Sequence, residues 1–119
     1  MRRTSRSEQE DYRRQARVCK AFANPTRLRL ITLLGQKQHW ASELRSGLGI
    51  SKANLSQHLA ILKTAGVVST SRIGRKLYCG LSMPGAKQVV ALLRSMTKSH
   101  YRRPPAPRGT ANRKSPESD

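Results

Sequence analysis

The sequence of 119 residues is poor in acidic residues, in cysteine and in aromatic side chains. Six Asp and Glu residues stand against 24 Lys and Arg residues, so the formal net charge at pH 7 is +18. Residues 18–97 contain twelve basic residues and a single acid, Glu43. Because so many cations cannot be neutralised within the chain, the composition predicts a polyanionic partner, and nucleic acid is the natural candidate.

The same scarcity argues against several other classes of protein. One acid in the central region leaves no carboxylate pair for acid–base catalysis, and neither a glycine-rich phosphate loop nor a Ser/Cys–His spacing indicates an enzyme. No apolar run approaches the roughly 18 residues of a membrane-spanning helix, and no signal peptide is visible, so we expect no membrane partner. Only two cysteines in a chain without an export signal favour a reduced, cytoplasmic location. A chain of this length can bury one core without disulfides.

The stretch 42–62, SELRSGLGISKANLSQHLAIL, predicts a helix-turn-helix. Leu44 and Leu48 lie four residues apart and share one side of its first helix, which we expect over 41–48. Glycine tolerates the left-handed backbone that a sharp helix exit needs, so Gly47 and Gly49 are expected to break this helix.

The second helix, expected over 51–65, offers DNA a small polar face. Ser51 is a good N-cap, and leucines recur every three or four residues to form a buried stripe. Gln57 points away from that stripe together with the small Ala53 and Ala60, and a glutamine can pair with two atoms of an adenine edge. The plainer alternative is that Gln57 is an exposed polar residue on a solvated helix.

A flexible basic arm at 1–7 and a first helix over 8–23 are expected at the start of the chain. This helix carries Tyr12, Ala16, Cys19 and either Phe22 or Ala23 along one apolar face.

Asn24 and Pro25 form a helix start signal, because asparagine caps the first turn and proline at the first position loses no needed N–H. The second helix is expected over 25–34 and is ended by Gly35. A short polar connection over 36–40 then leads into the helix-turn-helix.

A β-hairpin follows the helix-turn-helix directly, as a wing would. Residues 67–73 are β-branched and half alternating, Gly74-Arg75 forms a tight turn, and residues 76–81 return as the partner strand. The tip of this wing carries three basic residues placed to meet phosphates or to enter a minor groove: Arg72, Arg75 and Lys76.

A last helix is expected over 84–98, and its apolar residues cover more than one narrow stripe, which fits burial by its own subunit on one side and by a partner on the other. Those residues are Val89, Val90, Leu92, Leu93 and Met96. From residue 101 the chain is rich in Pro, Arg and small polar residues, so a disordered tail is predicted over 101–119. The predicted fold is mainly α with a small β-hairpin, a winged helix-turn-helix domain over 8–100 with the order α-α-α-α-β-β-α.

This order of elements resembles the ArsR/SmtB family of bacterial winged-helix repressors. The resemblance rests on FANPTRLRLITLL at 22–34, SELRSGLGISKANLSQHLAILKTAGVV at 42–68 and GRKLYCGL at 74–81. It implies a homodimer joined through the helices at 8–23 and 84–98, which binds an inverted-repeat operator and is released by a small inducer. The candidate DNA-binding residues are Ser51, Lys52, Ala53, Asn54, Ser56, Gln57, His58, Arg72, Arg75 and Lys76.

The sequence departs from the family in its inducer site. The positions of the Cys-x-Cys pair of metal-sensing relatives are Trp40 and Ser42, and neither is a thiolate ligand. The positions of the zinc ligands on the last helix of other relatives are Ala86, Gln88, Ser99 and Arg102, with His100 one residue out of register. No metal or other cofactor is therefore expected, and the inducer is left open.

For five residues, two cysteines, two histidines and a tryptophan, the sequence allows either a structural or a functional role. Cys19 and Cys79 do not occupy the positions of the dithiol switch of sulfur-responsive relatives; each is expected to be a small buried hydrophobe, with a thiol sensor as the alternative. His39 is expected to be exposed rather than a ligand, and His58 to pack at the edge of the leucine stripe or to touch a phosphate. Trp40 is expected to lie partly in the core.

Two functions compete on this evidence. The favoured one is a dimeric, sequence-specific transcriptional repressor that inserts the helix at 51–65 into the major groove, with the wing at 67–81 on the flanking backbone. The alternative is a sequence-blind architectural DNA- or RNA-binding protein that uses the winged-helix scaffold and its charge. Salt dependence and competitor DNA separate the two, because a specific repressor keeps its preference for one site as salt rises.

Overall fold

The computed structural model describes residues 2–100 and shows a mainly helical fold with one small sheet. The elements are α1 (Arg6–Phe22), α2 (Pro25–Gln36), β1 (His39–Trp40), α3 (Ala41–Leu48), α4 (Lys52–Thr64), β2 (Val68–Ile73), β3 (Lys76–Leu81) and α5 (Gly85–His100). The predicted helix-turn-helix is α3 and α4, and the predicted wing is β2 and β3. The predicted tail at 101–119 lies outside the described residues.

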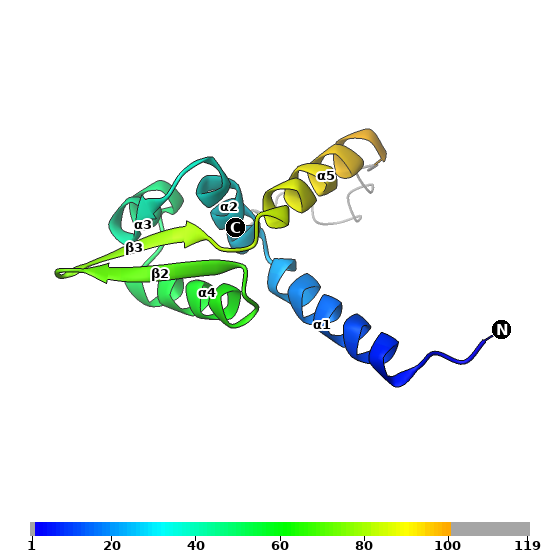
Figure 1. The fold of residues 1–119 in the computed structure, drawn as a ribbon. Coiled ribbons are helices and arrows are strands. Elements are labelled where there is room, and N and C mark those ends of the chain that lie inside the picture. The colour runs from blue at the N-terminus through cyan, green and yellow to red at the C-terminus, as the bar shows by residue number, and fades with distance from the viewer. Residues whose placement is uncertain (1, 101–119) are drawn as a thin grey trace, which may run out of the picture.

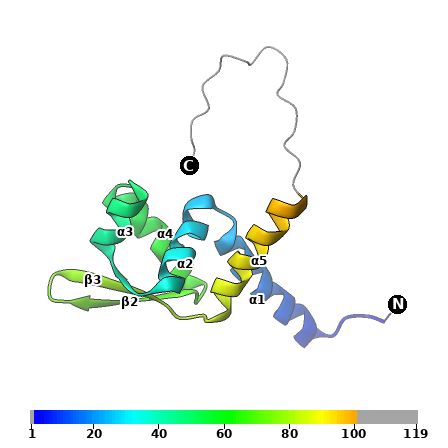
Figure 2. The ribbon, with the colours of Figure 1, turned by 90° about the horizontal axis from the view of Figure 1, so that it is seen from above.

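The elements are arranged with the wing at one end of the molecule and the two terminal helices at the other (Figures 1 and 2). Helices α2, α3 and α4 form the body between them. Helices α1 and α5 diverge as they leave that body, and each extends well beyond it. The rest of the described chain does not cover the outer parts of α1 and α5. A second molecule could therefore pack against these two helices.

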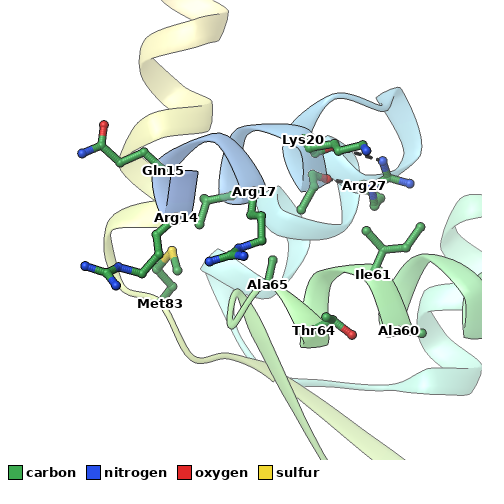
Figure 3. Close-up of a pocket in the computed structure, with 12 residues that line it drawn as sticks. Arg14, Gln15, Arg17, Lys20, Arg27, Ala60, Ile61, Thr64, Ala65 and Met83 are labelled. Carbon is green, nitrogen blue, oxygen red and sulfur yellow. Dashed lines mark hydrogen bonds between the residues drawn. The ribbon is translucent and has the colours of Figure 1, made fainter. Parts of the chain in front are cut away.

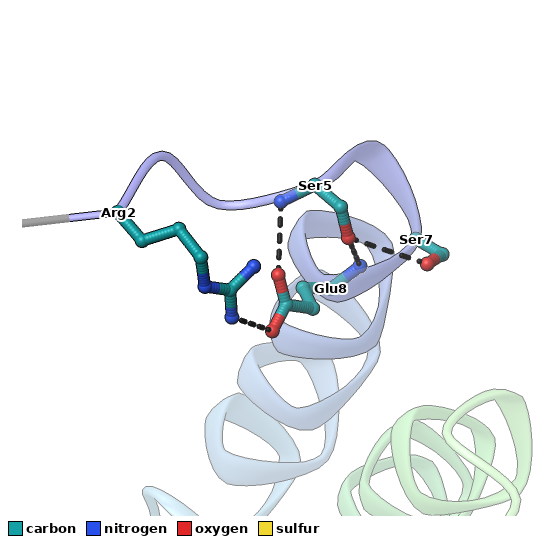
Figure 4. Close-up of polar contacts among 4 residues, drawn as sticks. All are labelled: Arg2, Ser5, Ser7 and Glu8. Carbon is teal, nitrogen blue, oxygen red and sulfur yellow. Dashed lines mark hydrogen bonds and ion pairs between the residues drawn. The ribbon is translucent and has the colours of Figure 1, made fainter.

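The first helix begins two residues earlier than the sequence predicted, at Arg6. The hydroxyl of Ser5 accepts a hydrogen bond from the backbone N–H of Glu8 at 3.2 Å, and the Glu8 carboxylate accepts one from the N–H of Ser5 at 2.9 Å (Figure 4). This reciprocal capping box satisfies two N–H groups that a helix start leaves open. Arg2 adds an ion pair to Glu8 at 3.3 Å, so part of the segment expected as a free arm is ordered at the helix start.

The second helix runs through Gly35 instead of ending there. Its start is as predicted: the side chain of Asn24 accepts from the N–H of Arg27 at 3.1 Å, and Pro25 follows at the first position. A Cβ on Gly35 would lie 3.0 Å from Cγ of Lys87, at the beginning of α5. Glycine at this position therefore allows α5 to cross close to α2, a contact that a search for helix-ending residues could not reveal.

The sheet has three strands in the order β1-β3-β2, all antiparallel. The wing hairpin has the predicted register, with Ile73 opposite Lys76 and Gly74 in a left-handed conformation at φ 64°. The segment expected as a polar connection over 36–40 instead contributes strand β1, whose His39 pairs with Cys79. Two residues are too few for an alternating pattern, so the pairing could not be read from the sequence.

The core lies where α2, α3, α4 and the inner face of the sheet meet. Its fully buried large side chains are Leu30, Ile31, Leu44, Leu62, Val67 and Cys79. The predicted leucine stripe of α4 belongs to this core, with Leu55 and Leu59 also buried. Within residues 2–100, no helix combines the length and the apolar character that a membrane crossing requires.

Candidate nucleic-acid interface

Helix α4 presents to solvent the face that the sequence assigned to DNA. The hydroxyl of Ser51 accepts from the N–H of Asn54 at 3.1 Å and fixes the start of the helix. Because the leucine stripe anchors the opposite side, Gln57 and its small neighbours on this face are exposed. All ten predicted contact residues are exposed except His58, which is half-buried.

A basic cleft of about 230 Å³ separates α4 from the wing. Five cationic side chains line it: Arg45, Lys52, Arg72, Arg75 and Lys76. No carboxylate is found among its lining residues in the described part of the chain. Four of these cations were predicted as DNA contacts, and the structure adds Arg45 of α3, which periodicity could not place opposite the wing.

The wing is held against the body by an aromatic contact beside this cleft. The rings of Trp40 and Tyr78 lie with their centroids 4.7 Å apart at an angle of 48°. The ammonium group of Lys76 lies 5.4 Å from the centre of the Trp40 ring, within the range of a cation–π interaction. Trp40 is half-buried, but it packs on Tyr78 beside the cleft and is not among the residues that pack against the core, which corrects the expectation for it. The short strand β1 therefore positions a side chain that orients one cation of the wing.

His39 is largely buried, which corrects the expectation of an exposed histidine. Its side chain is 15% exposed, and its Nδ1 lies 3.4 Å from the carboxylate of Glu43. That carboxylate also accepts the backbone N–H of Trp40 at 2.9 Å, which is the main cause of a lowered pKa for Glu43. Glu43, the single acid of the central region, therefore caps the start of α3 and pairs with His39. It is not among the residues that line the cleft.

His58 connects α4 to the rest of the body through Arg27. The guanidinium of Arg27 donates from Nη1 to Nδ1 of His58 at 3.3 Å, and from Nε to the carbonyl of Ala21 at 2.6 Å. Burial, and then the nearby charge of Arg27, hold the pKa of His58 below its ordinary value near 6.5. This geometry agrees with the expectation that His58 packs at the edge of the stripe.

This lowered pKa predicts a loss of stability in mild acid. The unfolded chain takes up a proton on His58 before the folded chain does, so the free energy of unfolding falls as the pH falls below about 6.5. We expect His58→Gln, which cannot titrate, to lose less stability than the wild type between pH 7.5 and 5.5 in urea unfolding experiments. An equal loss in the two proteins would show that other groups account for the slope.

The two cysteines lie in different environments. Cys79 is fully buried, as expected, and burial raises the pKa of its thiol. Cys19 is exposed, which corrects the expectation of a buried hydrophobe. The apolar face that Cys19 shares with Tyr12 does exist, but it points out of the chain, and Tyr12 is 65% exposed.

The described residues provide no cluster of three or more His, Cys, Asp or Glu side chains suited to a metal ion. At the family's metal positions, Trp40 packs against Tyr78 with the two rings tilted, and Ala86 is buried in the core. The side chains of Ser99 and His100 and all of Arg102 lie outside the part of the chain whose side chains are described.

Comparison with known proteins identifies the family. The family model described as bacterial regulatory protein, arsR family, matches residues 24–70, from the cap of α2 into the wing. The uncharacterized HTH-type transcriptional regulator Rv0081 of Mycobacterium tuberculosis is 33% identical over 86 residues, which cover 71% of this chain and 75% of the relative. The transcriptional repressor SdpR of Bacillus subtilis is 38% identical over 65 residues, covering 55% of this chain and 72% of the relative.

A solved structure gives the same result at the level of the fold. The homodimeric winged helix-turn-helix DNA-binding domain of Mb0332 from Mycobacterium bovis, described as a possible ArsR-family regulator, superposes with a TM-score of 0.73 at 26% identity. The superposition covers 86% of this chain and 94% of that domain. The family model and a relative that is 33% identical over 71% of this chain and 75% of its own length together show that the chain belongs to the ArsR family of bacterial regulatory proteins.

Proposed function

We propose that the protein is a homodimeric, sequence-specific transcriptional repressor that binds an inverted-repeat operator in the bacterial cytoplasm. In this proposal α4 enters the major groove and Gln57 reads a base edge, while the wing and Arg45 hold the flanking phosphates. The family is one of transcriptional regulators, and SdpR is named as a repressor.

The observation that supports this proposal most directly is the pairing of a neutral face with a basic one. The exposed face of α4 carries small and amide side chains, which suit base edges, and the basic cleft beside it carries five cations, which suit phosphates. In a protein that bound DNA through charge alone, we would expect cations on the exposed face of α4 as well, at the centre of the binding surface.

The test is enrichment of random duplex DNA by the purified protein at about 150–200 mM salt, where sequence-blind phosphate binding is weakened. We expect a two-fold symmetric consensus, with half-sites about one helical turn apart. Enrichment without a consensus would instead support the architectural alternative, for which neither the relatives nor the described geometry offers a specific observation.

Replacement of Gln57 by alanine tests the base-reading role. We expect Gln57→Ala to relax the sequence preference at one position in each half-site and to weaken binding of the best site by roughly 1–3 kcal/mol per half-site, because a bidentate contact is lost. Gln36→Ala is the matched control, since Gln36 is an exposed glutamine at the end of α2. Competition binding against sites mutated one position at a time measures both effects, and an unchanged preference would remove Gln57 from the set of readers.

A further inference from the structure

A second, larger hollow lies on the other side of the recognition helix, between α1 and α4. This α1–α4 groove has a volume of about 800 Å³. Figure 3 shows its two walls, with Arg14 and Arg17 projecting from α1 and Ile61 and Thr64 from α4. Met83, from the segment before α5, closes one end.

The lining of the groove combines an apolar floor with a cationic rim. The groove's apolar lining residues are Val18, Ala21, Ile61, Ala65 and Met83, and Ile61 as a whole residue is 44% exposed. The rim carries the four cations Arg14, Arg17, Lys20 and Arg27. As far as the described residues show, no acidic side chain lines the groove. Asp11, which pairs with Arg14, is not among the lining residues.

The groove is distinct from the apolar face of α1 that the proposed dimer would cover. At about 100° per residue, Arg14 and Ala21 lie on the opposite side of α1 from Tyr12, Ala16 and Cys19. A partner seated on the Tyr12 face therefore leaves the groove open.

We propose that the α1–α4 groove binds an amphipathic anion, a small molecule with an extended apolar body and one carboxylate or similar acidic group. The apolar body would cover the floor and remove its exposed carbon surface from water. The acidic group would pair with the guanidinium groups of the rim, which hold carboxylates in a bidentate geometry. A nucleic acid backbone would leave the floor exposed, and a cationic or neutral molecule would add no negative charge to the rim, where, among the described residues, only Arg14 already pairs with a carboxylate, that of Asp11.

Arg27 connects this groove to helix α4, because it lines the groove and also hydrogen-bonds to His58. It holds the end of α1 through the carbonyls of Ala21 and Lys20, at 2.6 and 3.4 Å, and it donates to His58 of α4. A carboxylate in the groove competes for the same guanidinium protons, which loosens the contact between α1 and α4. The anion would also lie beside Thr64 and repel DNA phosphates. We therefore expect occupancy to weaken DNA binding, a consequence that rests on the proposed function.

The binding step is tested without DNA, by isothermal titration calorimetry of the full-length protein with dodecanoate below its micelle concentration. We expect saturable binding that Arg17→Glu and Ile61→Glu each weaken at least tenfold. Arg94→Glu is the control, because it makes the same charge change on α5 and leaves affinity within about twofold. Butanoate, which lacks the apolar body, and dodecanol, which lacks the charge, are each expected to bind at least tenfold more weakly than dodecanoate.

Three results overturn the proposal. The first is absence of saturable dodecanoate binding, and the second is equal weakening by Arg17→Glu and Arg94→Glu, which would show attraction by net charge alone. The third is conversion of a dimer to a monomer by Ile61→Glu in sedimentation experiments, which would make the groove an interface between copies.

The regulatory step is tested separately, on the DNA site selected in the absence of dodecanoate. Saturating dodecanoate is expected to weaken binding of that site at least fivefold in the wild type and less than twofold in Arg17→Glu. Unchanged DNA affinity with the groove occupied overturns the regulatory step. Failure of the proposed function is distinguishable, because it shows as the lack of a preferred site before any dodecanoate is added.

Discussion

Replacement of Leu92 by glutamate is expected to turn the proposed dimer into a monomer and to weaken binding of the selected DNA site at least 100-fold. Leu92 is 61% exposed in the single chain, and Val89, Leu93 and Met96 beside it are 37% to 51% exposed. These four residues lie within about 100° of arc on α5, and beside them on the helix lie Ala86 and Val90, which pack in the core of their own chain. Such a stripe of large apolar side chains on an outer helix face marks an association surface.

The size of the expected loss follows from the loss of the second half-site. A dimer binds its second half-site as an intramolecular event, so a monomer gives up that effective concentration without any change in its own DNA contacts. Sedimentation experiments should show a mass of 13.3 kDa for Leu92→Glu in place of twice that value. Ala91→Glu introduces the same side chain on the other exposed side of α5 and should remain a dimer. A dimeric, fully active Leu92→Glu would place the interface elsewhere.

The elements and their ends could largely be predicted from the sequence where local chemistry decides them. Asn24 and Ser51 cap their helices through their own side chains, and Gly49 and Gly74 adopt the left-handed backbone that their turns require. Each of these choices depends on a few neighbouring residues, so it is visible in the sequence itself. The exposed face of α4 follows in the same way from the leucine stripe on its other side.

The parts that could not be predicted depend on contacts between distant segments. Gly35 looked like a helix end because its partner Lys87 is 52 residues away in the chain. His39 is buried because β1 adds to the wing, and that pairing has no local pattern. Cys19 illustrates a different limit: periodicity identifies an apolar face, but it does not say whether the chain itself or a second copy covers that face.

The candidate interface shows the same division. Lys52 and the wing cations were found because charge on a recognition helix and on a hairpin tip is legible in the sequence. Arg45 of α3 was missed, since only the folded chain brings it beside the wing. The α1–α4 groove was missed entirely, because its cations come from two helices whose separate sequences look merely basic and solvated.

The basic cleft provides the second large prediction, a loss of salt dependence when its cations are removed. We expect the triple variant Lys52→Ala, Arg72→Ala, Arg75→Ala to bind its selected site about 100-fold more weakly per half-site at 150 mM salt, since each phosphate contact contributes roughly 1 kcal/mol. The slope of log affinity against log salt concentration should fall by about 2.7 per half-site, or about 5.4 for the dimer, because each neutralised phosphate contributes roughly 0.9. Anisotropy titrations at several salt concentrations measure both quantities.

A control variant with the same change in net charge distinguishes direct contacts with DNA phosphates from attraction of DNA by the protein's overall charge. Lys37→Ala, Lys87→Ala, Arg94→Ala removes three exposed cations that do not line the cleft. Screening limits charges at that distance to a small effect at 150 mM salt, so its slope should change by less than about 1. If both triple variants lose the same affinity and slope, DNA responds to the net charge of +18 and not to the cleft. A loss confined to the cleft variant, with the Gln57-dependent preference intact, assigns phosphate holding and base reading to separate surfaces of one interface.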